Sequence, residues 1–185
     1  HSFTPLLPGT ARQIMPRPTE TRSRKTRAEG QRISVPHHVR RRLSEEAVLS
    51  SAERLFVRNG FHGTKVDDIA KDAGLTKGAV YFHFKDKSNV LLALLRRAED
   101  RVLVPILSRM RSADLSATEK IVEYLHGWAR IALEQRDTLF LPILMSFEFL
   151  GTGDPIERQI KGMYDRIYDS LTAVVEQGRA DGEFH

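Results

Sequence analysis

Two short helical patterns on either side of a tight glycine turn constrain the fold of this chain more than any other feature. The first begins at Thr64 and ends at Gly74, and only Leu75 separates that glycine from Thr76, which we expect to cap the next helix. In the first pattern Val66, Ile69, Ala70 and Ala73 have the spacing of one helix face, and the second helix carries Gly78, Ala79, Val80 and Phe82. Two short helices joined across such a turn form a helix-turn-helix.

The chain from Ser44 onward keeps a helical period and shows no convincing strand alternation. Predicted helices begin at Ser44, Thr64, Thr76, Asp86, Ser116, Asp137 and Asp154. Pro105 is expected to kink or interrupt the helix from Asp86, because proline lacks the amide hydrogen that a helix interior requires. We therefore predict an all-α fold, in which a three-helix head is joined through a long helix to a helical body.

Positive charge is concentrated at the N-terminal end. Residues 1–43 hold ten Arg and Lys against two Glu, a net charge of +8, whereas 44–87 are neutral and 88–185 carry −3. The same 43 residues contain five of the eight prolines and no sustained apolar period, so we predict a basic, mostly disordered arm. Such an arm suits a polyanion partner, and a solubilising linker is the alternative.

Several classes of function lack support in this sequence. The absence of cysteine excludes disulfides, thiolate metal clusters and a cysteine nucleophile. No phosphate loop, dinucleotide fingerprint, His-Glu-x-x-His motif or plausible catalytic triad occurs, so we expect no enzyme, no cofactor and no metal. No apolar run reaches the roughly 18 residues that span a bilayer, and no secretory signal opens the chain. We expect a soluble, cytoplasmic protein without a membrane partner.

The helix after the glycine turn has the composition that major-groove binding requires. Its first residues have to be small or polar so that the helix can enter the groove. They are Thr76, Lys77, Gly78 and Ala79, of which Lys77 is expected to read bases while Thr76 and Ala79 pack against base edges. Phosphate contacts are expected from Thr64, with its hydroxyl and amide directed outward, and from Tyr81, His83 and Lys87. Phe82 and Phe84 are interpreted as core of the head.

One run of residues resembles the N-terminal signature of the TetR (tetracycline-repressor-like) family over residues 47–91. It comprises Ala52, Leu55-Phe56, Gly60-Phe61, Thr64, Val66, Ile69-Ala70, Ala73 to Gly78, Tyr81, His83-Phe84, Lys87 and Leu91. The resemblance implies a dimeric, ligand-responsive repressor that binds a palindromic double-stranded operator and releases it when a small effector enters the C-terminal domain. It also implies the DNA roles just given. Lys65 is a further candidate contact, but it stands where the family more often has a small hydroxyl residue, so the resemblance itself does not imply a phosphate contact at this position.

The resemblance divides the chain into three parts: a basic arm at 1–43, a DNA-binding domain at 44–87, and an effector-binding and dimerisation domain at 88–185. Within the arm, Arg40, Arg41 and Arg42 are candidates for minor-groove or phosphate contacts. The Asp-Gly-Glu-Phe at 181–184 resembles the loop after the family's seventh helix. Since members normally continue into two dimerising helices, we expect a fragment, with a differently built dimer as the alternative.

Aromatic and thioether side chains in the C-terminal part predict a pocket for a hydrophobic effector. The candidates are Trp128, Phe140, Met145, Phe147, Phe149, Met163 and Tyr164, with Arg130, Glu134 and Glu148 as polar anchors. Ordinary core packing is the alternative for each of them. A helical adaptor or membrane-surface protein that uses its basic arm on anionic lipid is the alternative for the chain as a whole.

Overall fold

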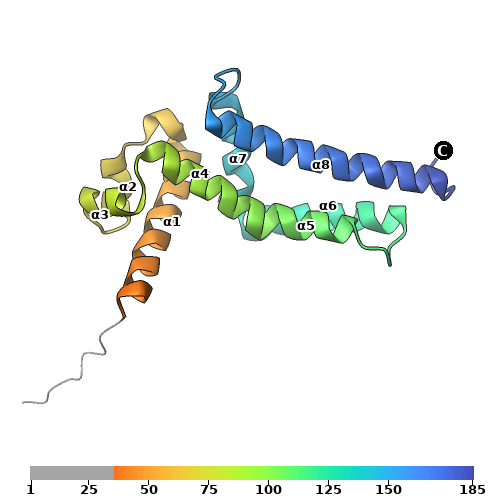
Figure 1. Cartoon of the computed structure of the whole chain (residues 1–185), viewed down its shortest axis with the longest axis horizontal. Helices are drawn as coiled ribbons and strands as arrows, with labels where there is room; N and C mark the ends of the chain where they lie inside the picture. Colours follow the sequence, from red (N-terminus) through yellow and green to blue (C-terminus); the bar gives the residue numbers. More distant parts are fainter. Residues whose placement is uncertain (1–35) are drawn as a thin grey trace, which may run out of the picture. The chain divides into compact units, whose positions relative to one another are not determined.

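The computed structural model describes residues 36–185, and this part of the chain consists of helices and connecting turns without a strand (Figure 1). The elements are α1 (His37–Gly63), α2 (Val66–Asp72), α3 (Lys77–His83), α4 (Lys87–Ala98), the π-helical turn η1 (Glu99–Leu103), α5 (Val104–Met110), α6 (Ala117–Glu134), α7 (Arg136–Glu148) and α8 (Pro155–Ala180). The all-α prediction is confirmed. Residues 1–35 of the predicted arm lie outside the described residues.

The head comprises α1, α2 and α3, which pack against one another around a small apolar core. Phe56 and Ile69 are fully buried, and Val80 is the residue that α3 contributes to the fully buried core. Gly74, with a φ of 66°, forms the turn between α2 and α3, a conformation that glycine adopts without the strain a Cβ would add. The turn therefore fixes α3 across α2, as a helix-turn-helix requires.

Side-chain caps confirm four predicted helix starts. Thr76 Oγ1 accepts a hydrogen bond from the Ala79 amide at 3.2 Å, and the Asp86 carboxylate accepts one from the Asn89 amide at 2.8 Å. Ser116 forms a capping box, and Asp154 caps α8 ahead of its first-turn proline. These caps accept hydrogen bonds from amides that the helix itself leaves unpaired. Because each cap acts on an amide only two or three residues away, the local sequence is enough to predict these helix starts.

The predicted start at Ser44 is wrong, because α1 begins seven residues earlier at His37 and Pro36 is its N-cap. Proline at the start costs no helical hydrogen bond, and arginine, which fills three of the next six positions, is a good helix former. Ser44 lies inside α1, where its hydroxyl donates to the Arg41 carbonyl at 2.9 Å. Residues 37–43 are thus helical rather than disordered.

The helix that begins at α4 continues through Pro105 by means of η1. Proline at position 105 cannot donate a hydrogen bond to the carbonyl of Arg101, and its ring crowds that carbonyl. The π-helical turn Glu99–Leu103 ends two residues before Pro105 and widens the helix there. The chain then follows α5 to Met110 without leaving the helical conformation.

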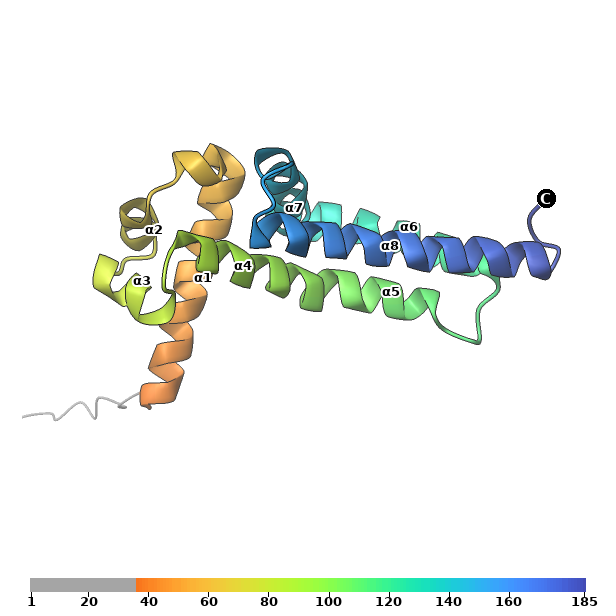
Figure 2. The ribbon, with the colours of Figure 1, turned by 45° about the horizontal axis from the view of Figure 1, so that its top comes forward.

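The body is formed by α4 to α8. In both ribbon views α8 runs alongside α5 and α6, and α7 connects α6 to α8 next to α1 (Figures 1 and 2). After α8, Glu183 accepts hydrogen bonds from the amides of Ala117 and Thr118 at 3.0 and 2.9 Å and so caps α6. Among residues 36–185, every helix is too short or too polar to cross a bilayer.

Candidate nucleic-acid interface and effector cavity

The first turn of α3 is helical and exposed, and most of its side chains are small. Thr76, Lys77 and Gly78 are exposed, and Ala79 is half-buried. A Cβ built on Gly78 would find only Thr76 Oγ1 within 4 Å, at 3.9 Å, and the backbone of Gly78 does not have a positive φ. Neither packing nor backbone conformation inside the protein therefore requires glycine at this position. The arrangement fits close approach of an external surface.

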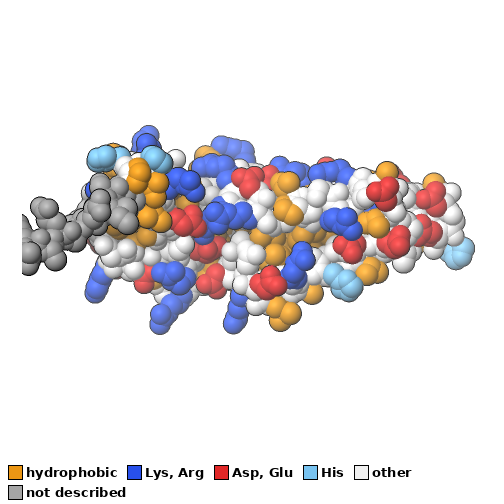
Figure 3. Space-filling view, turned by 90° about the horizontal axis from the view of Figure 1, so that it is seen from below, with side chains coloured by type: hydrophobic (Ala, Val, Ile, Leu, Met, Phe, Trp, Pro, Cys, Tyr) orange, Lys and Arg blue, Asp and Glu red, His pale blue; other side chains and the backbone are white. Residues whose placement is uncertain are grey.

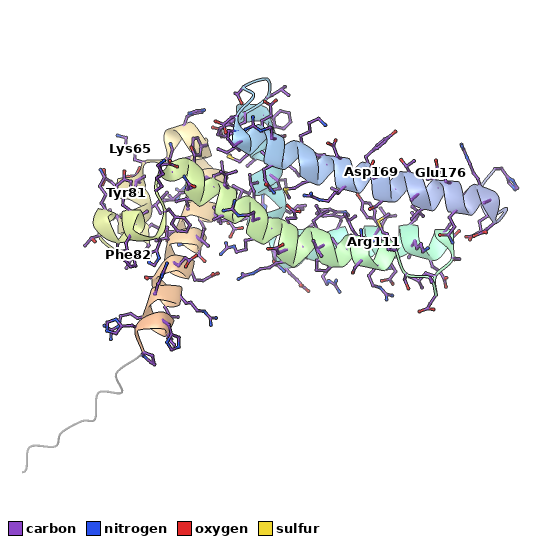
Figure 4. All side chains as sticks on the ribbon, viewed as in Figure 1. Lys65, Tyr81, Phe82, Arg111, Asp169 and Glu176 are labelled. Carbon is purple, nitrogen blue, oxygen red and sulfur yellow. The ribbon has the colours of Figure 1, made fainter. Side chains whose placement is uncertain are left out.

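Lys65 and Tyr81 flank this turn. Lys65 is exposed at the N-cap of α2, and Tyr81 on α3 exposes 47% of its surface. Figure 4 shows both residues, together with Phe82, along the same side of the head. A cation, a phenol and a slim helix start on one side form a surface on which phosphates and base edges could be contacted together.

Lys77 has an intramolecular partner that nucleic acid would have to replace. Its ammonium lies 2.9 Å from the Asp67 carboxylate, and both side chains are more than half exposed. Hydrogen bonding to Asp67 raises the pKa of Lys77. Because exposed ion pairs contribute little to stability, exchanging Asp67 for a polyanion would cost the fold little.

Thr64 and Lys87 do not point outward as predicted. Thr64 is buried, and its hydroxyl donates to the carbonyls of Leu55 at 3.1 Å and Gly60 at 2.8 Å. The Lys87 ammonium donates to the carbonyls of Phe61 at 2.6 Å and Thr64 at 2.8 Å. Both side chains thereby satisfy carbonyls where α1 ends, which sequence spacing alone does not reveal. Burial lowers the pKa of Lys87.

His83 is turned toward α1. Its Nε2 lies 2.7 Å from the Ser44 hydroxyl, and its Nδ1 is buried without a hydrogen-bond partner among the described residues. The ring thus connects the end of α3 to the N-terminal half of α1. It supports the orientation of α3 rather than standing free on the surface.

Phe82 is not part of the core, contrary to the prediction. It exposes 70% of its surface, whereas Phe84 is buried at 7%. The guanidinium carbon of Arg41 lies 5.7 Å from the centroid of the Phe82 ring. Figure 3 shows hydrophobic side chains exposed on the head beside histidines, with Lys and Arg side chains farther along.

The three candidate arm arginines belong to the first turns of α1. Arg40, Arg41 and Arg42 are all exposed. Arg41 lies next to α3 through its contact with Phe82. A helical extension presents these side chains at fixed positions relative to α3, which a disordered arm does not do.

The body contains an apolar cavity of about 300 Å³. Its wall is formed by Ala98, Val102 and Leu103; Tyr124 and Trp128; Thr138, Leu139, Pro142 and Ile143; and Ile160, Met163, Tyr164 and Ile167. None of these residues carries a charge, so the wall suits an uncharged, largely apolar molecule.

The predicted effector residues divide between this wall and other places. Trp128, Met163 and Tyr164 line the cavity, and Met145 is buried in the core. Phe140 is outside the wall and lies near Arg136, while Phe147 and Phe149 border a second hollow between α7 and α8. Of the three predicted polar anchors, Arg130 and Glu134 are exposed.

Trp128 brings a polar group to the apolar wall. Its indole N–H is buried and has no hydrogen-bond partner within residues 36–185. A buried donor without an acceptor costs about 1–3 kcal/mol. A molecule with a suitably placed acceptor could remove that cost.

Helix α7 contacts the head at both of its ends. Near its start, the Thr138 hydroxyl donates to the Glu53 carboxylate at 2.8 Å, and Glu53 pairs with Arg97 of α4 at 2.6 Å. At its end, the Glu148 carboxylate accepts from the amides of Phe61 at 2.9 Å and His62 at 3.2 Å. Thr138 also lines the cavity, so one helix contacts both the cavity and helix α1 of the head. Glu148 is therefore a head contact and not the effector anchor expected from sequence.

The profile of the family described as "Bacterial regulatory proteins, tetR family" matches residues 48–94. Among proteins similar in sequence, the HTH-type transcriptional regulator AcrR of Shigella flexneri is 28% identical over 141 residues, 72% of this chain and 65% of that protein. The HTH-type transcriptional repressor BepR of Brucella suis is 26% identical over 76% of this chain and 68% of that protein.

Among solved structures, the MbdR regulator from Azoarcus sp. CIB matches with a TM-score of 0.69 and 39% identity, over 77% of this chain and 74% of that chain. By sequence, the present chain spans about two thirds of the AcrR and BepR proteins that it matches. AcrR and BepR, which it resembles in sequence, and MbdR, which it also resembles in fold, are all named as regulators or repressors. The residues matched by the family profile include the helix-turn-helix.

Proposed function

Because the chain belongs to the tetR family of bacterial regulatory proteins, we propose that it is a ligand-responsive transcriptional repressor that binds a palindromic DNA operator as a dimer. On this proposal Lys77 reads bases from the start of α3, and Thr76, Gly78 and Ala79 allow the helix to approach them. Lys65 and Tyr81 bind backbone phosphates, and Arg40, Arg41 and Arg42 add contacts beside the main site. Its place of action is the cytoplasm.

The observation that carries this proposal is the exposed first turn of α3, where glycine is present without an internal need for it. A surface that only had to face water would gain helix stability from alanine at position 78. Glycine at that position is favourable where another molecule must approach the backbone closely.

Selection of bound duplexes from a random pool by the full chain tests the proposal. The expected result is enrichment of a palindrome, bound at least about 1,000-fold more tightly than random duplex at physiological salt. Anionic vesicles provide a parallel assay for the alternative of a membrane-surface protein. Equal binding to every duplex, or preference for vesicles, would contradict the assignment.

The effector is proposed to occupy the cavity between α4, α6, α7 and α8. The uncharged wall favours an apolar body, and the unpaired indole N–H of Trp128 favours one hydrogen-bond acceptor on that body. We infer that α7 carries the response, since Thr138 joins the cavity wall to Glu53 of α1. A ligand that moves α7 would therefore shift the position of α1 in the head.

Trp128→Phe is expected to weaken binding through the hydrogen-bond acceptor of the proposed effector and to leave binding of its apolar body unchanged. Phenylalanine keeps an aromatic wall but removes the donor, so binding of a ketone that fits the cavity should weaken about fivefold, while a hydrocarbon of the same shape should bind unchanged. Calorimetric titration of both compounds measures this difference. In the unsubstituted protein the same titrations can be followed by fluorescence, since the chain has a single tryptophan. Equal losses for both compounds would argue against a role for the N–H.

A further inference from the structure

Phe82 lies on the face of α3 that points away from the core of the head. Successive helical residues are rotated by about 100°, so Gly78 and Phe82, four positions apart, lie nearly above one another. Each is two positions from Val80, which is the buried residue of this helix, and both therefore point away from the core. Gly78 leaves open space around its backbone, and Phe82 follows it one turn later with a large ring.

The head does not need the Phe82 ring for its own stability. With 70% of its surface exposed, the ring buries little apolar area, and Phe84 supplies the aromatic residue of the core at this end of α3. The Arg41 guanidinium lies against one side of the ring at 5.7 Å. That contact restricts the ring and leaves much of it accessible beside Lys65 and Tyr81 (Figure 4).

We propose that Phe82 is a specificity-determining residue that contacts the C5-methyl group of a thymine in the major groove. This inference rests on the proposed DNA binding through α3. Phenylalanine has no donor and cannot hydrogen-bond a phosphate or a base edge. Among the groups that the four bases present in the major groove, the thymine methyl is the apolar one, and aromatic rings contact it. The thymine lies beyond the bases that Lys77 reads, because Phe82 is more than one turn farther along α3.

Deoxyuridine provides the test, because it removes the methyl group of thymidine and leaves base pairing unchanged. An operator selected by the full chain is prepared with each thymine replaced in turn by deoxyuridine. One replacement in a half-site is expected to weaken binding about fourfold, the factor that corresponds to about 0.8 kcal/mol for one buried methyl group. Phe82→Ala should weaken binding to the unmodified operator by at least as much, and should show no further loss on that particular deoxyuridine duplex.

Phe147→Ala is the matched control, because Phe147 is a phenylalanine that is 75% exposed on α7, outside the head. It should bind every duplex like the unsubstituted chain. Circular dichroism verifies that both variants fold. If Phe82→Ala loses affinity equally on all duplexes and keeps the deoxyuridine effect, the ring contacts the sugar-phosphate backbone and the inference is wrong. Unchanged operator binding by Phe82→Ala also overturns it. Failure of the unsubstituted chain to select any duplex instead contradicts the proposed function itself.

Discussion

Gly78→Leu is expected to lower operator affinity by at least about 100-fold while the protein stays folded. Gly78 lies on the face of α3 that points away from the core of the head. A leucine side chain there would hold the helix away from the base edges that Lys77 has to reach. Losing one well-formed base contact costs about 1–3 kcal/mol, and losing the closely packed neighbours adds to it. Fluorescence anisotropy with a labelled operator measures the change.

Gly78→Ala places a smaller side chain at the same position and is expected to weaken operator binding less than Gly78→Leu. Its Cβ would meet only Thr76 Oγ1 at 3.9 Å, so alanine fits and should stabilise the helix by roughly 0.5 kcal/mol. We therefore expect a variant that melts no lower than the unsubstituted protein and binds the operator more weakly. Gly162→Ala in α8 is the control, since a Cβ there finds only an Arg166 side-chain nitrogen at 4.0 Å. Normal operator binding by Gly78→Leu would show that the start of α3 does not enter the groove.

The head was largely predictable because its signals are local. Caps such as Thr76 and Asp86 act within four residues, and the positive φ at Gly74 depends on one residue only. The exposure of Phe82 is predictable as well, since its position relative to Val80 points it outward, whereas its aromatic side chain alone favours the core. Residue type and helical phase gave opposite answers, and helical phase was correct.

The contacts that join head and body could not be predicted in the same way. Glu148 binds the Phe61 amide across 87 positions, and Thr138 binds Glu53 across 85. Such pairs depend on how whole helices pack, and no local period encodes them. The inward orientation of Lys87 has the same origin, because its carbonyl partners belong to the end of α1. The cavity wall likewise combines residues of several helices, and the sequence candidates include only three of them, Trp128, Met163 and Tyr164.

Arg97→Met is expected to destabilise the protein by about 3 kcal/mol, because it leaves a nearly buried carboxylate without its cation. Arg97 lies 2.6 Å from Glu53 and 2.8 Å from Glu46, and the side chains of Arg97 and Glu53 are only 12% and 14% exposed. Thr138 would still donate to Glu53, yet one neutral hydrogen bond does not replace a guanidinium. Urea unfolding followed by circular dichroism measures the loss.

Two further variants distinguish a buried ion pair from general sensitivity of the fold. Arg109→Met removes an arginine whose pair with Glu123, at 3.4 Å, is 56% and 43% exposed, and it should cost less than about 0.5 kcal/mol. Combining Arg97→Met with Glu53→Leu removes both charges, and it should recover most of the stability because no buried charge remains unpaired. A double variant as unstable as Arg97→Met alone would mean that Glu53 stabilises the junction of α1, α4 and α7 through Thr138 rather than through Arg97.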